Sequence, residues 1–151
     1  MKSSAAFNMI ELMISVAIIA DIAVIAVPSY VRSREFAQDS RFASDLRTAV
    51  DAFEMYAAEH NGYPPNSPTG TVPQGMDQYL RAMNWSAGNS IGGEWAWDSN
   101  RNGSVAAVCV EFRFTPDELR MVRIDERIDN GILTTGSFRK VSDTRYGLII
   151  E

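Results

Sequence analysis

The residues whose side chains could carry chemistry are few in this chain of 151 residues. It contains one cysteine, Cys109, and one histidine, His60. A lone cysteine forms no internal disulfide and builds no cysteine metal cluster, and a lone histidine excludes motifs that need two. We interpret Cys109 as a small packed hydrophobe and His60 as a residue near the negative end of a helix dipole. We therefore expect no enzymatic activity.

One stretch has the spacing of a cation loop. Asp98, Asn100 and Asn102 alternate and are followed by Gly103, as in the first half of a calcium-binding loop. The carboxylate that such a loop has at its twelfth position is missing, because Cys109 stands there. We interpret the stretch first as the turn of a hairpin, with a calcium site as the alternative.

A second group of acids lies near the end of an expected short helix. Asp125 and Asp129 are one helical turn apart and could chelate a cation. The alternatives are a solvated acidic face, or intersubunit salt bridges to Arg120, Arg123 or Arg127, each of which contributes little if it is exposed. Apart from calcium at these two places, we expect no cofactor.

Three tryptophans offer either a binding platform or core. Trp95 and Trp97 point to the same side of an expected strand, and Trp85 precedes them. An aromatic platform for a sugar or polymer is one interpretation. We favour the other, in which these rings pack the head of the protein onto a helix.

Composition limits the class of protein. The chain is 46% hydrophobic and 22% charged, which is typical of a folded chain of about one domain. Its net charge is −5, whereas binding to nucleic acid phosphates needs a basic surface. Nucleic acid is therefore not an expected partner.

The apolar run from Phe7 to Val27 contains an unexpected glutamate, Glu11. As a helix the run spans roughly 30 Å, enough to cross the hydrocarbon core of a membrane. Besides Glu11 it contains Ser15 and Asp21. A charged side chain at membrane depth costs about 3 kcal/mol, so the two acids need an explanation.

Two interpretations leave Glu11 without a partner. In a cleaved secretion signal, Lys2 would be the basic end and the small residues at 24–26 the cleavage site. The two acids and the length of the apolar core disfavour this. The other interpretation is a plain transmembrane anchor in which the acids have no role. Acids inside a membrane are usually functional, which disfavours this interpretation too.

The stretch Ala6-Phe7-Asn8-Met9-Ile10-Glu11 gives the glutamate a role. It resembles the processing site of type IV pilins and type II secretion pseudopilins. That family has a short polar leader, a small residue, Phe, and Glu four residues later, with a proline twenty-one residues after the Phe. Pro28 and Tyr30 fit this pattern in register. Ala6 replaces the family's usual Gly, and Asn8 its usual Thr.

The resemblance implies a mechanism. A prepilin peptidase would cut between Ala6 and Phe7 and methylate the new amine, leaving 1–6 as leader. The positively charged amine of Phe7 would pair with Glu11 of a neighbouring subunit, which lowers the free-energy cost of holding both charges in lipid. The further partners implied are other pilin-like subunits and an assembly platform in the bacterial inner membrane, with a periplasmic head.

The fold that we expect is α+β. Residues 7–30 form the transmembrane and assembly helix, and 31–61 continue it with an apolar stripe. The whole helix would be roughly 80 Å long and ends at Asn61-Gly62. The stripe comprises Phe36, Ala43, Leu46, Val50, Phe53, Ala57 and His60.

Residues 62–151 are expected to form a small head with antiparallel strands, for which the long helix supplies one wall. The main strand is expected over Val105–Phe114, with Phe112 and Phe114 on one face. The other expected elements are a loop at 62–75, a short helix at 76–83, a strand at Trp95–Trp97, a helix starting in a Thr115 capping box and ending at Ile128, and a hairpin of 136–140 and 145–150.

These expectations favour a pilin-like structural subunit of a membrane-anchored filament, foremost a pseudopilin of a type II secretion-like system. The alternatives are a major or minor type IV pilin, and a single-pass membrane-anchored binding domain that does not polymerise. The head lacks the paired cysteines that close a C-terminal loop in many pilins.

Overall fold

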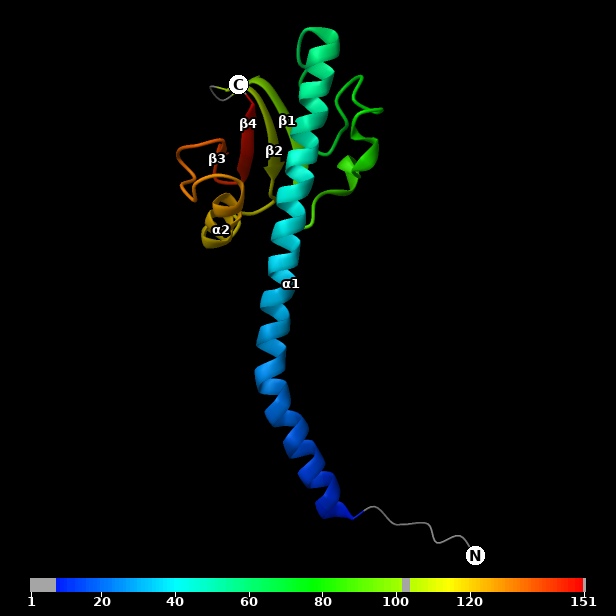
Figure 1. The fold of residues 1–151 in the computed structure, drawn as a ribbon, viewed down its shortest axis with the longest axis vertical. Coiled ribbons are helices and arrows are strands. Elements are labelled where there is room, and N and C mark those ends of the chain that lie inside the picture. Colours follow the sequence, from blue (N-terminus) through cyan, green and yellow to red (C-terminus); the bar gives the residue numbers. More distant parts are fainter. Residues whose placement is uncertain (1–7, 102–103, 151) are drawn as a thin grey trace, which may run out of the picture. The chain divides into compact units, whose positions relative to one another are not determined.

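The computed structural model describes residues 8–101 and 104–150. The chain divides into two compact units, residues 1–37 and 38–151, and helix α1 (Met9–His60) runs through both (Figure 1). The first unit consists, in its described part, of α1 alone. The second contains the rest of α1 and an α+β head, as the sequence predicts.

Helix α1 begins and ends with recognisable local chemistry. At its start the side-chain Oδ1 of Asn8 accepts a hydrogen bond from the amide of Ile10 at 3.4 Å. At its end Asn61 takes a left-handed conformation with φ 55°, and the Gly62 amide donates to the carbonyl of Ala57 at 3.2 Å. These bonds satisfy backbone groups that the helix leaves unpaired. The predicted helix stop at Asn61-Gly62 is confirmed.

The head is built on one antiparallel sheet with strand order β1-β2-β4-β3. A second helix, α2, precedes β3, and two short 3₁₀ turns, η1 and η2, precede β1. The strands are β1 (Glu94–Arg101), β2 (Ser104–Glu111), β3 (Phe138–Lys140) and β4 (Arg145–Ile150); α2 is Glu118–Ile128, η1 Leu80–Ala82 and η2 Trp85–Ala87.

One face of the sheet and the second half of α1 share the main core. Phe53 on α1 stacks on Trp97 of β1 at a centroid distance of 3.8 Å, and Phe42 stacks on Trp95 at 5.6 Å. The helix therefore forms one wall of the core, as expected. The largest fully buried side chains are Trp85, Trp95, Trp97, Tyr146, Phe42, Phe53, Phe138, Leu46, Met76, Met121, Ile124 and Val108.

The tryptophans are core residues and not a surface platform. All three are at most 2% exposed. The indole of Trp97 donates to the carbonyl of Pro64, and that of Trp85 to the carbonyl of Thr71, each at 3.0 Å. These bonds tie the 62–75 loop to the core. The alternative of an aromatic platform for a sugar is wrong, because no ring face is open to solvent.

The predicted stripe on α1 is right in its middle and wrong at its ends. Leu46, Val50 and Phe53 are buried, whereas Phe36 is 63% exposed and His60 is exposed. The sequence pattern missed Phe42, which is fully buried. Only the turns of α1 that face the sheet are covered, so a stripe continued by periodicity alone runs past the core.

Three boundaries differ from the predictions. Strand β2 ends at Glu111, and Phe114 beyond it is 76% exposed and not on a core face. The cap of α2 is Asp117 and not Thr115, since the Asp117 carboxylate accepts from the Leu119 amide at 3.1 Å. The helix expected at 76–83 is only the 3₁₀ turn η1. The predicted hairpin of β3 and β4 is confirmed.

Candidate functional site

The first candidate site is the apolar part of α1. Every described side chain from Asn8 to Ala37 is exposed. An 18-residue window of this helix reaches a mean hydropathy of 2.5, and none of it is buried within the chain. By length and composition α1 could span a membrane. An apolar surface of this extent needs lipid or protein to cover it.

Two acids interrupt this surface. Glu11 and Asp21 are both exposed on α1. The hydroxyl of Ser15 donates to the Glu11 backbone carbonyl at 2.7 Å, so the helix itself satisfies that polar group. Neither carboxylate has an ion-pair partner among the residues that the structure describes. The predicted processing residues Ala6 and Phe7 lie outside the described residues.

Pro28 lies inside α1, which continues past it. Proline has no amide hydrogen, so the helix lacks one of its backbone bonds at this turn. The hydroxyl of Ser33 donates to the carbonyl of Ser29 at 3.0 Å in the following turn. The proline that the sequence placed at the end of the apolar run is thus part of a continuous helix.

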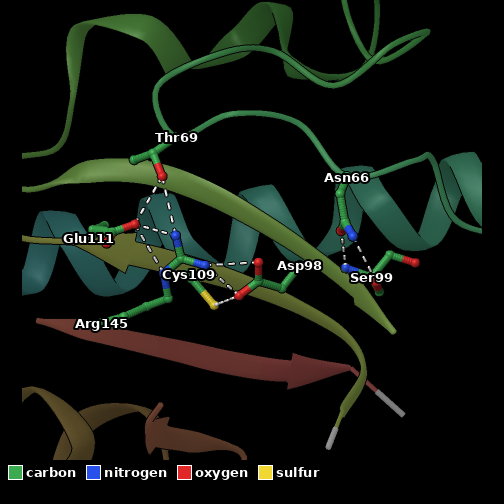
Figure 2. A network of polar contacts seen from close by, with 7 residues as sticks. All are labelled: Asn66, Thr69, Asp98, Ser99, Cys109, Glu111 and Arg145. Carbon is green, nitrogen blue, oxygen red and sulfur yellow. Dashed lines mark hydrogen bonds and ion pairs between the residues drawn. The ribbon is translucent and has the colours of Figure 1, made fainter. Parts of the chain in front are cut away.

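A second candidate site is a polar network on the face of the sheet opposite the main core (Figure 2). The guanidinium of Arg145 donates to both carboxylate oxygens of Asp98, at 2.8 and 2.9 Å. It also bonds Glu111, with the Nε atom 3.1 Å from Oε2, and the hydroxyl of Thr69 at 3.2 Å. Thr69 in turn donates to Glu111 at 2.9 Å. One arginine thereby joins β1, β2, β4 and the 62–75 loop.

Burial and charge act together on this network. The Arg145 and Asp98 side chains are 15% and 4% exposed. Burial works against the charge on Arg145, but its bonds to Glu111 and Asp98 outweigh burial and raise its pKa. Burial likewise acts to raise the pKa of Glu111, and the bonds from Arg145 and Thr69 outweigh it, so that this pKa is lowered. Both shifts favour the charged forms of Arg145 and Glu111 at neutral pH.

Cys109 lies beneath this network. It is fully buried, and its thiol donates to Asp98 Oδ2 at 3.7 Å. Burial, followed by the charge of Asp98, raises the pKa of the thiol far above its ordinary value. A thiol that stays protonated is a poor nucleophile. The sulfur lies close to Gly147 on the neighbouring strand β4, where an added Cβ atom would come within 2.5 Å of it. This face of the sheet therefore has no room for a side chain at position 147.

The calcium-loop pattern does not bring its ligands together among the described residues. The Asp98 carboxylate is bonded to Arg145, and Asn100 is exposed with a φ of 52°. Asn102 lies outside the described residues. No group of three or more His, Cys, Asp or Glu side chains with metal-binding geometry occurs in the described ranges.

The two acids near the end of α2 have separate environments. Asp125 is fully buried, and neither of its carboxylate oxygens has a hydrogen-bond partner with good geometry among the described residues. Burial and the charge of Asp129 raise its pKa, while the nearby backbone amides of residues 130–132 lower it in part. Asp129 is exposed and accepts from the Ser137 amide. Neither acid belongs to a group of three or more potential metal ligands among the described residues.

Two arginines of α2 contact α1 and not the acids at 125–129, and the intersubunit salt bridges stay a prediction. Arg120 pairs with the buried Asp39 of α1 at 2.8 Å. Arg127 bonds the hydroxyl of Ser40, and its backbone carbonyl accepts from Arg47 at 2.8 Å. These contacts attach α2 to α1 within the second unit.

The Arg145 network is the part that sequence reasoning missed. Arg145 and Asp98 are 47 residues apart. Alternation along β1 and β2 places Asp98, Cys109 and Glu111 on one face. This alternation could have predicted that the three side chains lie close together. The strand order that brings β4 beside β2 was not readable from the residues.

Searches against known protein families, curated proteins and solved structures found no match to this chain.

Proposed function

We propose that this chain is a pilin-like structural subunit of a membrane-anchored filament, most closely a pseudopilin of a type II secretion-like system. The observation that carries the proposal is the sequence spacing of Phe7, Glu11 and Pro28 in an apolar run whose described side chains, from Asn8 on, are exposed. A membrane-spanning segment alone would explain the apolar surface. It would not explain the acid four residues after Phe7.

The assembly step follows from charge. After cleavage at Ala6–Phe7, the amine of Phe7 carries a positive charge, and Glu11 carries a negative one. Each is costly in hydrocarbon, and pairing them between two subunits offsets part of that cost. A subunit docked in the wrong axial position leaves both charges unpaired. The pairing therefore selects the axial register of neighbouring helices.

The proposal includes the location and partners of the chain. A prepilin peptidase removes residues 1–6, the helix is held in the bacterial inner membrane before assembly, and the head is periplasmic. The filament contains this chain or other pilin-like subunits, joined through an assembly platform. Helix α1 carries both the apolar segment and, through Phe42 and Phe53, one wall of the head core.

Two other functions remain candidates for the same helix. A major or minor type IV pilin would use the same cleavage and the same Glu11 pairing. A single-pass anchored binding domain would use the helix only as an anchor and would not polymerise.

Mass spectrometry of the N-terminal peptide tests the proposal, after expression of the full chain with and without a prepilin peptidase. We expect a chain that begins at N-methylated Phe7 only when the peptidase is present. A chain that begins at Val27 in both samples would show an ordinary secretion signal and overturn the proposal. An uncut Met1 in both samples would favour the anchored binding domain.

A further inference from the structure

The charged residues of the apolar helix are not distributed evenly around it. Successive residues of an α-helix are about 100° apart, so residues 11 positions apart lie within about 20° of one another. Asp21 and Arg32 are such a pair, and Glu11 lies within roughly 80° of Asp21. Arg34 lies about 160° away from Arg32. One face of α1 thus carries both acids and one of the two arginines that follow the apolar run.

Asp21 and Arg32 cannot neutralise each other within one chain. Eleven residues of helix separate them by about 17 Å along the axis, well beyond the reach of an ion pair. Both are exposed, and neither has an ion-pair partner among the residues that the structure describes. Residues 8–31 contain no lysine or arginine. The apolar segment itself offers Asp21 no counter-charge.

The carboxylate of Asp21 is therefore without a counter-charge inside the membrane-spanning segment. An unpaired carboxylate at the depth of Asp21 is costly in a membrane. The hydroxyl of Ser15, by contrast, bonds a backbone carbonyl of its own helix. Arg32 lies one turn beyond Pro28, and its long side chain can extend along the helix toward the apolar segment. A parallel second helix shifted by about 17 Å would place Arg32 directly beside Asp21.

We propose that Asp21 forms an ion pair with Arg32 of a second copy of this chain, through the face of α1 that both residues share. The proposal rests on the proposed function, since it needs an assembly of parallel helices. The Phe7–Glu11 pairing needs an axial shift of only about 6 Å. The two ion pairs therefore join one subunit to two different neighbours, and together they fix two contacts of the filament.

Disulfide cross-linking tests the contact without removing either charge. Ile18 and Ser29 lie on the same face and are also 11 residues apart, so they should meet between the same two copies. The full chain with Ile18→Cys, Ser29→Cys and Cys109→Ala is assembled and oxidised. We expect a ladder of covalent oligomers, with linked peptides that contain positions 18 and 29.

The matched control is Val16→Cys with Val27→Cys, which has the same spacing on the opposite face. We expect at least about tenfold less cross-linking of this pair than of the 18–29 pair. Filaments that assemble without an 18–29 link would overturn the Asp21–Arg32 pair and leave the proposed function intact. Failure of the unaltered chain to assemble with its machinery would instead count against the proposed function.

Charge reversal gives an independent test. Asp21→Arg or Arg32→Asp alone should reduce incorporation into filaments at least about tenfold, as expected for two like charges facing each other in lipid. The double reversal should restore incorporation to within a few-fold of the unaltered chain. Arg34→Asp, on another face, is the control. Membrane fractionation confirms that each variant is inserted, and an inserted double variant that is as defective as the single ones contradicts the proposal.

Discussion

The ring of Phe53 lies 3.8 Å from the ring of Trp97, with only 9° between their planes. One ring comes from α1 and the other from β1, so this stack is a direct contact between the long helix and the sheet. Both residues are at most 1% exposed. Loss of either ring would open a cavity at the centre of the core.

Phe53→Ala should lower the free energy of unfolding by about 3–5 kcal/mol, because it removes buried apolar surface and leaves a cavity. Thermal unfolding of the full chain in detergent, followed by tryptophan fluorescence, measures the effect. Leu119→Ala is the control. Leu119 is 71% exposed on α2, so its truncation should change stability by less than about 0.5 kcal/mol. Equal effects of the two variants would contradict the core described above.

Arg145→Met should destabilise the head by about 3–5 kcal/mol, because it leaves the buried carboxylate of Asp98 without its guanidinium partner. The double variant Arg145→Met, Asp98→Asn should recover part of this loss, since the buried negative charge is then gone. The same fluorescence assay measures both. A double variant that is less stable than Arg145→Met would argue against an unpaired charge as the cause.

Glu111 should make the head sensitive to acid. Its pKa is lower in the folded protein than the ordinary value of 4.5, so its charged form stabilises the fold. This contribution is complete above about pH 4.5 and is lost as the pH falls through the lower folded pKa. The effect is modest, because the side chain is 35% exposed. Urea unfolding of the full chain between pH 3 and 7 should show a smaller acid loss for Glu111→Gln than for the unaltered chain.

Asp125 should have the opposite pH dependence. Its pKa is raised above the ordinary 3.8, so the fold favours the protonated form, and stability is lost as the pH rises from about 3.8 through the folded pKa. Asp125→Asn should therefore stabilise the protein at pH 7, by about 1 kcal/mol, and change little at pH 3. Unfolding at both pH values measures the difference. If Asp125→Asn instead destabilised the protein at pH 7, the Asp125 carboxylate would have to be well hydrogen-bonded in the fold.

Glu11→Ala should leave membrane insertion intact and abolish or strongly slow incorporation into filaments. Insertion is preserved because the substitution removes a charge from the apolar segment. Membrane fractionation measures insertion, and the amount of chain in sheared filaments measures incorporation. Normal assembly of this variant would rule out the Phe7–Glu11 pairing.

Local patterns determined the elements of this protein. The apolar run with Glu11 and Pro28, the stop at Asn61-Gly62 and the alternation in β2 each depend on residues close in sequence. The α+β class and the buried tryptophans followed from these patterns. The limits of the core did not, because the burial of Phe42 depends on how the sheet packs against α1 within the second unit.

Only the tertiary structure placed Arg145 over Cys109 and between Asp98 and Glu111. These residues come from three strands, and the order β1-β2-β4 that joins them reflects long-range pairing. The same pairing placed Asp98 in an ion pair instead of a cation loop. The sequence by itself determined the apolar segment and its acids, since their cost in lipid depends on residue type and helical spacing alone. Long-range packing decided which polar groups of the head meet, because strand order and burial are properties of the whole fold.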